Sequence, residues 1–376
     1  MHVICFDQPF PPTYGGAIDV FYRIKALHEA GIPLTLHIFL YHDRKPQKEM
    51  ETLAERVFYY KRNLGIRQNL SLKPYIVESR NNAEMLENLC LDNEPILFEG
   101  LHTTFLLDNN RLRGRKKIVR MHNIEHSYFL ALAKNKLFSL KSPYYIVESM
   151  KLRFYEKVLR HASLILPIST EDCKELKKRY PHNEVRLMDC FFDNTPARKD
   201  YNSRIVSANY ILYHGNLALA ENIRAAKYII SHSEKIVPEG WKLVIAGRKP
   251  DKALFALAKW KGNIDILSNP SPEELENLLA NAHINLLVTF QKTGVKLKLL
   301  NTLAKSYGFC IVNSNMLYGT PLKPLCHEAN TPQEIRKTIE ILAKKTIKEE
   351  EYFERQEKLK NFGFNDISPI LSFISE

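Results

Sequence analysis

The sequence lacks any long apolar run, and this absence limits where the protein can act. None of its apolar stretches approaches the roughly 20 residues that a helix needs to span a bilayer. The first seven residues read as a strand and not as a signal peptide. We therefore expect a cytoplasmic protein, with peripheral attachment to the cytoplasmic membrane face as a further possibility to test.

Cysteine is scarce, with 6 among 376 residues and no CxxC pair. Scattered cysteines with mostly apolar neighbours favour reduced core thiols over disulfides or a zinc cluster. An Asp-x-Asp motif, which could anchor a divalent cation, is also missing. We therefore expect no bound metal. The cysteines are Cys5, Cys90, Cys173, Cys190, Cys310 and Cys326.

Acidic residues are too few to balance the basic ones, and the net charge of +12 invites an anionic partner. Basic residues concentrate at 111–117 and, beside aromatic residues, at 59–63. Both segments fit an anionic membrane surface, and both fit a solvated loop equally well. No RNA- or DNA-binding motif accompanies them, so we expect no nucleic-acid partner.

Apolar residues are plentiful enough, at 45% of the chain, to fill the cores of two domains. Strand-like runs alternate with helical patterns in both halves, which predicts βαβ units and parallel sheets. The predicted strands are 3–6, 34–39, 96–98, 118–121, 164–168, 210–213, 242–246, 284–288 and 309–312. The predicted helices are 17–30, 145–160, 222–233, 272–280 and 296–306.

The fold class is therefore α/β, with two doubly wound, Rossmann-like domains facing across a cleft. A polar segment at 192–203 is the expected linker. We expect one domain at 1–195, a second at 205–350, and C-terminal helices at 351–376. Ligands of such sheets bind at the carboxyl ends of the strands.

The segment 290–301 is the most informative part of the chain. It follows a buried strand, contains Gly294, and opens a helix whose first turn holds Lys296 and Lys298. Free backbone N–H groups, the helix dipole and the lysine charges together favour phosphate.

Three other strand ends carry glycines or polar groups. Gly15 and Gly16 precede the first helix, where a ligand site or a plain tight turn would each use them. Gly215 and Asn216 follow the strand 210–213, and a turn would explain them as well as a ligand would. Arg248 follows the strand 242–246 beside a glycine, again at a carboxyl edge.

His122 and Glu99 are the candidate catalytic residues of the first half. Each ends a predicted strand, where the side chain can point into the cleft. His122 could bind a substrate hydroxyl or stabilise charge, and a surface histidine near a helix cap is the alternative. Arg120 would share a strand face with His122 and could pair with an acid. Glu99 could face the acceptor or serve as a satisfied structural carboxylate.

A zinc hydrolase is a separate hypothesis for the same region. His122, Glu125 and His126 match the letters H-x-x-E-H, in which two histidines on a helix bind zinc and the glutamate activates water. His122 directly follows a strand, however, and the sequence nominates no third ligand.

The order of these segments resembles the retaining GT-B glycosyltransferases of the group 1, family-four-like lineage. The resemblance spans nearly the whole chain and includes the Gly-Gly loop, the segment 213–217, the segment 243–250 and the donor loop and helix at 293–304. It implies a nucleotide diphosphate sugar as donor substrate, held mainly by the second domain, and an acceptor held by the first. It also implies that no cofactor is needed. It further implies that the C-terminal helices at 351–376 cross back to the first domain, and a terminal helix on the second domain is the alternative.

The resemblance assigns roles to individual residues. It places Gly16 by the donor phosphate and His122 near the transferred sugar, and it lines the donor site with Gly215 and Asn216. It gives the diphosphate to the backbone of Gly294 and Val295, with Lys296 or Lys298 neutralising its charge. The family usually has two glutamates where this chain has Thr293 and Asn301, which can bind hydroxyls but bring no carboxylate.

The predicted function is therefore a hexosyltransferase-type glycosyltransferase (EC 2.4), acting on a glycan, lipid-linked or polysaccharide acceptor with retention and without metal. Backbone donors, a helix dipole and lysine can stabilise a departing diphosphate. A non-catalytic subunit that binds sugar nucleotides is the alternative that the two missing glutamates support.

Overall fold

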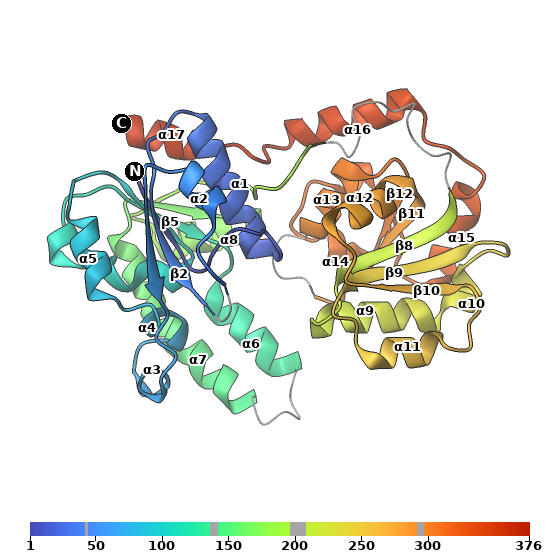
Figure 1. Cartoon of the computed structure of the whole chain (residues 1–376), viewed down its shortest axis with the longest axis horizontal. Coiled ribbons are helices and arrows are strands. Elements are labelled where there is room, and N and C mark those ends of the chain that lie inside the picture. Colours follow the sequence, from blue (N-terminus) through green and yellow to red (C-terminus); the bar gives the residue numbers. More distant parts are fainter. Residues whose placement is uncertain (42–43, 136–141, 196–207, 292–296) are drawn as a thin grey trace. The chain divides into compact units, whose positions relative to one another are not determined.

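The computed structural model describes residues 1–41, 44–135, 142–195, 208–291 and 297–376. The chain divides into two compact units, one formed by Met1–Phe191 with Phe364–Glu376 and the other by Phe192–Gly363. Each contains one sheet with helices around it, as Figure 1 shows. All strand pairs are parallel, and the predicted α/β class with two Rossmann-like sheets is confirmed.

The first unit has a seven-stranded sheet in the order β3-β2-β1-β4-β5-β6-β7. Its strands are β1 (His2–Cys5), β2 (Thr35–Leu40), β3 (Arg56–Lys61), β4 (Ile96–Glu99), β5 (Lys117–Met121), β6 (Leu164–Pro167) and β7 (Glu184–Val185). The order reverses between β1 and β4, so the chain leaves these two neighbours in opposite directions. Such a switch point opens a crevice at the carboxyl edge of a parallel sheet.

Helices cover both faces of this sheet. They are α1 (Gly15–Glu29), α2 (Lys48–Thr52), α3 (Ile66–Leu70), α4 (Tyr75–Glu78), α5 (Ala83–Leu89), α6 (Glu125–Asn135), α7 (Ser142–Tyr155), α8 (Thr170–Arg179) and α17 (Ser368–Ser375). Successive strand residues face opposite sides, so Ile4 and Phe98 enter one core cluster, and Val3 and Leu97 enter the other. Helix α17 packs into the second of these clusters through Ile370 and Phe373.

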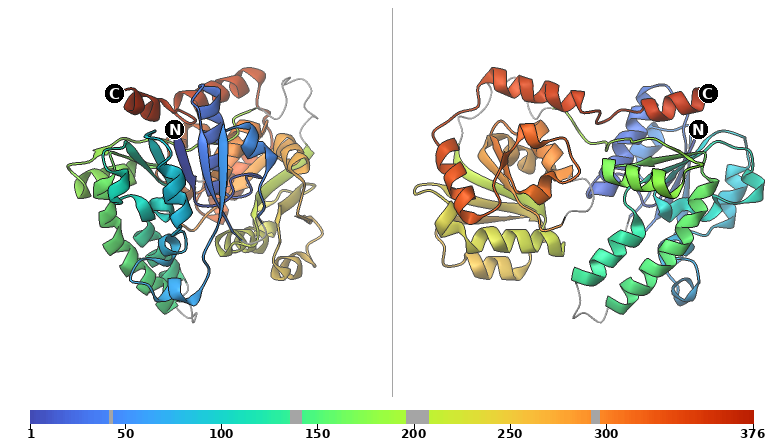
Figure 2. Two further views of the ribbon diagram at one scale, coloured as in Figure 1. Left: turned by 60° about the vertical axis from the view of Figure 1, so that its left-hand side comes forward. Right: turned by 180° about the vertical axis from the view of Figure 1, so that it is seen from behind.

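The second unit has a six-stranded sheet in the order β10-β9-β8-β11-β12-β13. Its strands are β8 (Ala208–Asn216), β9 (Lys242–Arg248), β10 (Ile264–Ser268), β11 (Ala282–Leu287), β12 (Phe309–Val312) and β13 (His327–Glu328). Its helices are α9 (Ala220–Ser231), α10 (Ser233–Ile236), α11 (Lys252–Ala258), α12 (Pro272–Asn281), α13 (Leu297–Lys305), α14 (Ser314–Leu317), α15 (Pro332–Leu342) and α16 (Glu349–Asn361). Figure 2 shows both sheets from two further sides.

Four strands were not among the predicted ones: β3, β10 and the two-residue strands β7 and β13. The basic and aromatic segment 59–63 is largely the end of β3, not a solvated loop, and β10 is also new. β3 and β10 are outer strands of their sheets and only partly buried, so neither shows the continuous apolar run of an inner parallel strand. All six cysteines are free thiols, and four of them are buried.

A buried chain of hydrogen bonds crosses the first three strands. His2 Nε2 lies 2.7 Å from Asp92 Oδ1, and His2 Nδ1 lies 2.9 Å from His37 Nε2. His37 Nδ1 lies 2.9 Å from the hydroxyl of Tyr60, which also accepts from Asn88 at 2.9 Å. Neutral histidines satisfy every contact, because each ring can donate once and accept once.

This chain predicts acid sensitivity of the fold. Burial lowers the pKa of His2, and burial together with His2 lowers that of His37 to about 3. The unfolded chain therefore binds protons first, and the free energy of unfolding should fall as the pH drops from about 6.5 towards 3. Urea unfolding at pH 7 and pH 5 measures the loss. We expect His37→Gln to lose less unfolding free energy between the two pH values than the parent does. His28→Gln, which replaces an exposed histidine, should lose as much as the parent. An equal loss in the parent and both variants would contradict this account.

Candidate functional site

The glycines of the first predicted loop lie at the start of α1, directly after the first strand. Helix α1 begins at Gly15 without a side-chain cap, so its first N–H groups are not satisfied by a capping side chain. A Cβ atom added at Gly16 would lie 2.9 Å from Cζ of Phe6. Glycine at position 16 therefore allows the Phe6 ring to pack closely against the start of the helix.

Beside this loop lies a buried cluster of charges that joins α1 to β4. The guanidinium of Arg23 donates to both carboxylate oxygens of Glu99, with a distance of 3.0 Å from Nε to Oε1. It also donates to Asp19 Oδ2 at 2.6 Å, one helical turn earlier. Arg23 and Glu99 are fully buried. Burial alone would raise the pKa of both carboxyls, but Arg23 holds each of them below its ordinary value.

Arg120 extends the cluster to β5. Its Nη2 lies 3.4 Å from Asp19 Oδ1 and donates to the carbonyl of Asp189 at 3.0 Å. The backbone N–H of Phe191 donates to the same Asp19 oxygen at 2.7 Å. The pairing of Arg120 with an acid is thus observed. Asp19 links α1 and β5 to Phe191, where the first segment of this unit ends.

His122 lies immediately after β5, against the two carboxylates. Its Nε2 is 3.2 Å from Glu99 Oε2, and its Nδ1 is 3.5 Å from Asp19 Oδ2. The edge of its ring also contacts the ring of Phe6. The imidazole is therefore held from several sides, while 11% of the side chain stays exposed. It is the member of the cluster that can meet a ligand.

Glu99 has the environment of a satisfied structural carboxylate, the alternative to the predicted acceptor-facing role. Its side chain has no exposed surface, and all its described partners are protein groups. A carboxylate so placed orients His122 and balances Arg23, and it has no exposed surface to offer a substrate. His102, which follows the same strand, is half-buried, and its buried Nδ1 atom has no described hydrogen-bond partner.

The zinc hypothesis finds no ligand set here. His122 contacts Glu99, whereas His126 Nδ1 lies 2.8 Å from Glu156 Oε2 in a separate buried group. Burial and the neighbouring Glu156 raise the pKa of Glu125 to about 8, which favours a protonated carboxyl. Within the described ranges, no three His, Cys, Asp or Glu side chains are grouped so that they could hold a metal ion.

In the second unit, the predicted donor residues gather at the carboxyl edge of β8 and β9. Asn216 and Arg248 are paired neighbours in register, and so are Gly215 and Gly247. A Cβ atom added at Gly247 would lie 1.9 Å from the carbonyl oxygen of Gly215, so no side chain fits there. Asn216 Oδ1 accepts from the N–H of Ala218 and so shapes the turn after β8. Arg248 itself is exposed.

Lys298 reaches the same edge from the first turn of α13. Its ammonium donates to Asn222 Oδ1 at 3.0 Å and to the hydroxyl of Tyr213 at 3.4 Å, both neutral groups. One turn later, Thr302 bonds to His214 at 2.7 Å, which fixes the helix against β8. Asn301 is half-buried on this helix. The predicted donor residues Thr293, Gly294, Val295 and Lys296 lie outside the described residues.

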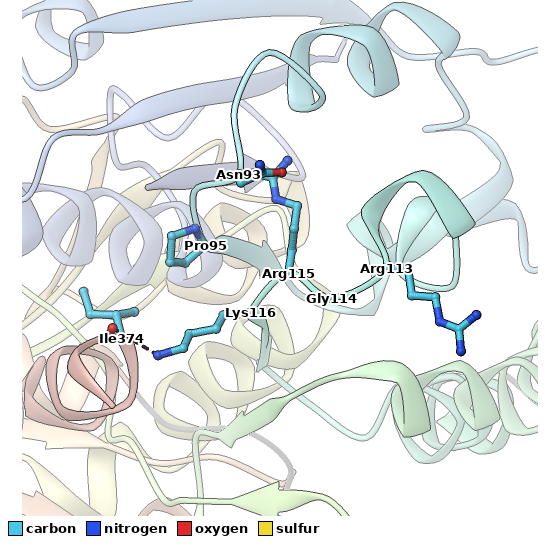
Figure 3. A pocket seen from close by; sticks show the side chains of 7 residues that line it. All are labelled: Asn93, Pro95, Arg113, Gly114, Arg115, Lys116 and Ile374. Atoms are coloured by element: carbon cyan, nitrogen blue, oxygen red, sulfur yellow. Dashed lines mark hydrogen bonds between the residues drawn. The ribbon is translucent and has the colours of Figure 1, made fainter.

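The basic segment 111–117 faces a pocket of about 450 Å³ near the C-terminus, shown in Figure 3. Its cations are largely engaged by the protein. Arg115 donates to the carbonyl of Glu94 at 3.0 Å, and Arg111 pairs with Glu87. Lys116 donates to the carbonyls of Phe373 and Ile374, both at 3.1 Å, and so holds the end of α17. Arg113 also lines the pocket, and its side chain extends away from the other labelled side chains in Figure 3. This segment is therefore mainly structural.

Sequence reasoning missed Asp19 and Arg23. The available signal was their spacing of four residues inside an apolar helical pattern, each one position before a core residue, Val20 or Ile24. Asn222 and Tyr213 were missed as partners of Lys298 because they are distant from it in sequence.

Comparison with known proteins identifies the fold. No protein-family model matches the chain. An uncharacterised 44.6 kDa protein from the cps region of Klebsiella pneumoniae is 25% identical over 317 residues, which cover 80% of this chain and 79% of that protein. Among the described helices, none combines the length and apolar character that a membrane crossing requires.

Solved structures resemble the chain over almost its full length. Sucrose-phosphate synthase from Thermosynechococcus elongatus has a TM-score of 0.67 at 12% identity and covers 96% of this chain and 94% of its own. HepE from Anabaena, in complex with UDP and glucose, has a TM-score of 0.66 at 11% identity and covers 100% and 99%. WaaG, a glycosyltransferase involved in lipopolysaccharide biosynthesis, has a TM-score of 0.63 at 12% identity and covers 96% and 95%. The predicted GT-B resemblance is confirmed, and the chain has the GT-B fold.

Proposed function

We propose that the protein is a glycosyltransferase that transfers a sugar from a nucleotide diphosphate sugar to a glycan acceptor. One observation carries the proposal: in a GT-B fold, His122 is held by Asp19 and Glu99 at the carboxyl edge of the first sheet, with part of its ring exposed. A histidine fixed in this way can hydrogen-bond a sugar hydroxyl without reorganising during the reaction. Glu99 and Arg23 act as positioning residues behind it.

The donor belongs at the second unit in this proposal. Lys298 at the start of α13 and Arg248 at the end of β9 bring positive charge to the edge where β8 turns at Gly215. A departing nucleoside diphosphate gains negative charge, and a lysine beside a helix N-terminus stabilises that charge. Gly294, Val295 and Lys296 remain predicted contacts of the same diphosphate.

The stereochemistry and the acceptor are finer parts of the proposal. Retention and independence from metal follow from the GT-B resemblance and the missing Asp-x-Asp motif. The cps-region relative and the lipopolysaccharide glycosyltransferase favour a polysaccharide or lipid-linked acceptor. The hexosyltransferase type (EC 2.4) and a cytoplasmic location belong to the same proposal.

A thermal-shift screen against UDP, GDP, ADP and CMP tests the donor site. We expect one diphosphate, with UDP as the first candidate because HepE was solved with UDP, to raise the melting temperature by a few degrees. A ligand at about 100 times its Kd stabilises a fold by about 2.7 kcal/mol. Lys298→Ala should abolish most of the shift, because a charge-assisted hydrogen bond contributes about 1.5–3 kcal/mol.

Lys242→Ala is the matched control. Lys242 is exposed at the opposite, amino end of β9, where it pairs with Asp265. This variant should keep the full shift. If no nucleotide stabilises the well-folded protein, or if both lysine variants respond as the parent does, the donor site is not where we place it.

A non-catalytic subunit that binds sugar nucleotides is the second candidate. Thr293 and Asn301 favour it, because the resembling family has glutamates at these positions, near the sugar and on the ribose, and neither residue here brings a carboxylate. Such a subunit would show the same thermal shift but release no diphosphate from any nucleotide sugar.

A further inference from the structure

Helix α7 carries large apolar side chains on its exposed side. Its buried side holds Leu152 together with three polar residues, Ser142, Glu148 and Ser149. Its outward side repeats large apolar residues at helical spacing, and Phe154 at its end is 66% exposed. These outward residues are Tyr144, Ile146, Val147, Met150 and Phe154.

A second apolar group surrounds α3. Leu72 just after this helix is 95% exposed, and Ile66 within it is 78% exposed. The other members are Leu64 and Leu70. Together with the outward residues of α7, these four side chains form what we call the apolar patch.

The two halves of the apolar patch lie side by side. Lys151 Nζ on α7 donates to the carbonyl of Asn69 on α3 at 3.0 Å. The N–H of Tyr75 donates to Glu148 Oε2 at 2.7 Å. Figure 1 and Figure 2 also show α3 beside α7. Nine of the 19 large apolar side chains exposed in the described residues belong to this patch, which marks a surface that meets an apolar partner.

The charges around the apolar patch are positive. Residues 64–73 contain Arg67 and Lys73 but no Asp or Glu. Between 142 and 157, the two glutamates are buried, and Glu148 pairs with Lys151 at 2.9 Å. Arg153 and Lys157, both exposed, lie at the end of the patch. A rim of cations without exposed carboxylates matches a negatively charged partner.

We propose that the apolar patch docks on an anionic lipid bilayer surface. Leu72, Ile66 and Phe154 enter the boundary between headgroups and acyl chains, as the apolar face of an interfacial helix does. Arg67, Arg153 and Lys157, all exposed, meet the lipid phosphates at the rim. A protein partner would need acidic groups opposite these cations. An anionic bilayer offers both negatively charged headgroups and an apolar acyl-chain region. The inference does not depend on the proposed sugar transfer.

Vesicle flotation of the full chain tests this surface. We expect the protein to float with vesicles of phosphatidylcholine with 30% phosphatidylglycerol, and to stay in solution with phosphatidylcholine alone. The double variant Leu72→Ser, Phe154→Ser should lower partitioning by at least about tenfold, because both side chains are exposed and carry apolar area into the bilayer. Trp260→Ser is the matched control, since Trp260 is 85% exposed outside the patch, and it should float as the parent does.

A charge variant separates the two contributions. Arg153→Glu with Lys157→Glu should lose flotation at low salt, and the parent should lose part of its binding as salt rises. The proposal is overturned if the parent does not float with anionic vesicles or if the serine double variant floats equally well. It is also overturned if size-exclusion chromatography shows a dimer that this double variant dissociates, because the patch would then bind a second copy of the chain.

Discussion

His122→Ala is expected to lower kcat/KM for sugar transfer by at least about 100-fold, the usual effect of removing one preorganised polar group that stabilises the transition state. The imidazole lies 3.2 Å from Glu99 and 3.5 Å from Asp19, so it is already oriented before substrate arrives. Alanine removes the ring but leaves both carboxylates paired with Arg23, so the fold should survive. Initial rates of nucleotide release at several donor concentrations measure the effect.

His28→Ala is the control for this experiment. His28 is an exposed histidine in the last turn of α1, so its loss changes no part of the charge cluster. It should retain full activity. A His122→Ala protein that keeps its melting temperature and its kcat/KM would remove His122 from the catalytic site.

Arg23→Ala is expected to cost about 3–5 kcal/mol of unfolding free energy, the range for removing one partner of a buried ion pair. Arg23 neutralises Asp19 and Glu99, which are both buried, and without it the described cation nearest to them is Arg120, which contacts Asp19 alone of the two. The unpaired charge, rather than the loss of packing, dominates the cost. Urea unfolding monitored by circular dichroism gives the free energy.

Lys25→Ala provides the matched comparison on the same helix. Lys25 pairs with Glu29 across one turn at the surface, where both side chains are well exposed. Such pairs contribute about 0.3–0.5 kcal/mol. If Arg23→Ala costs no more than Lys25→Ala, the buried cluster does not stabilise the first unit as described.

The inner strands of both sheets could be predicted from the sequence because burial on two faces leaves a nearly continuous apolar run. The predicted strands 96–98 and 309–312 coincide closely with β4 and β12. Outer strands carry no such run, which is why the sequence predicts a basic surface segment where the structure has β3. Helices α9 and α12 were located within two residues of their observed ends because their amphipathic patterns are clear.

The position of His122 at the end of a buried strand could also be predicted, but its environment could not. The contact of His122 with Asp19 and the hydrogen bonds that Arg23 donates to Glu99 depend on which face of α1 turns inward, and four-residue spacing alone does not specify that face. The same limit explains Glu99: a strand end predicts access to a ligand, whereas the observed side chain is enclosed by Arg23 and His122.

Release of nucleoside diphosphate from a panel of nucleotide sugars tests the central claim most directly. The parent protein, supplied with a membrane or polysaccharide extract as acceptor, should release one diphosphate, and His122→Ala should release it at least about 100-fold more slowly. Release that is equally fast in the parent and in His122→Ala, or no release from any nucleotide sugar by the folded parent, would contradict the assignment of glycosyl transfer to this site.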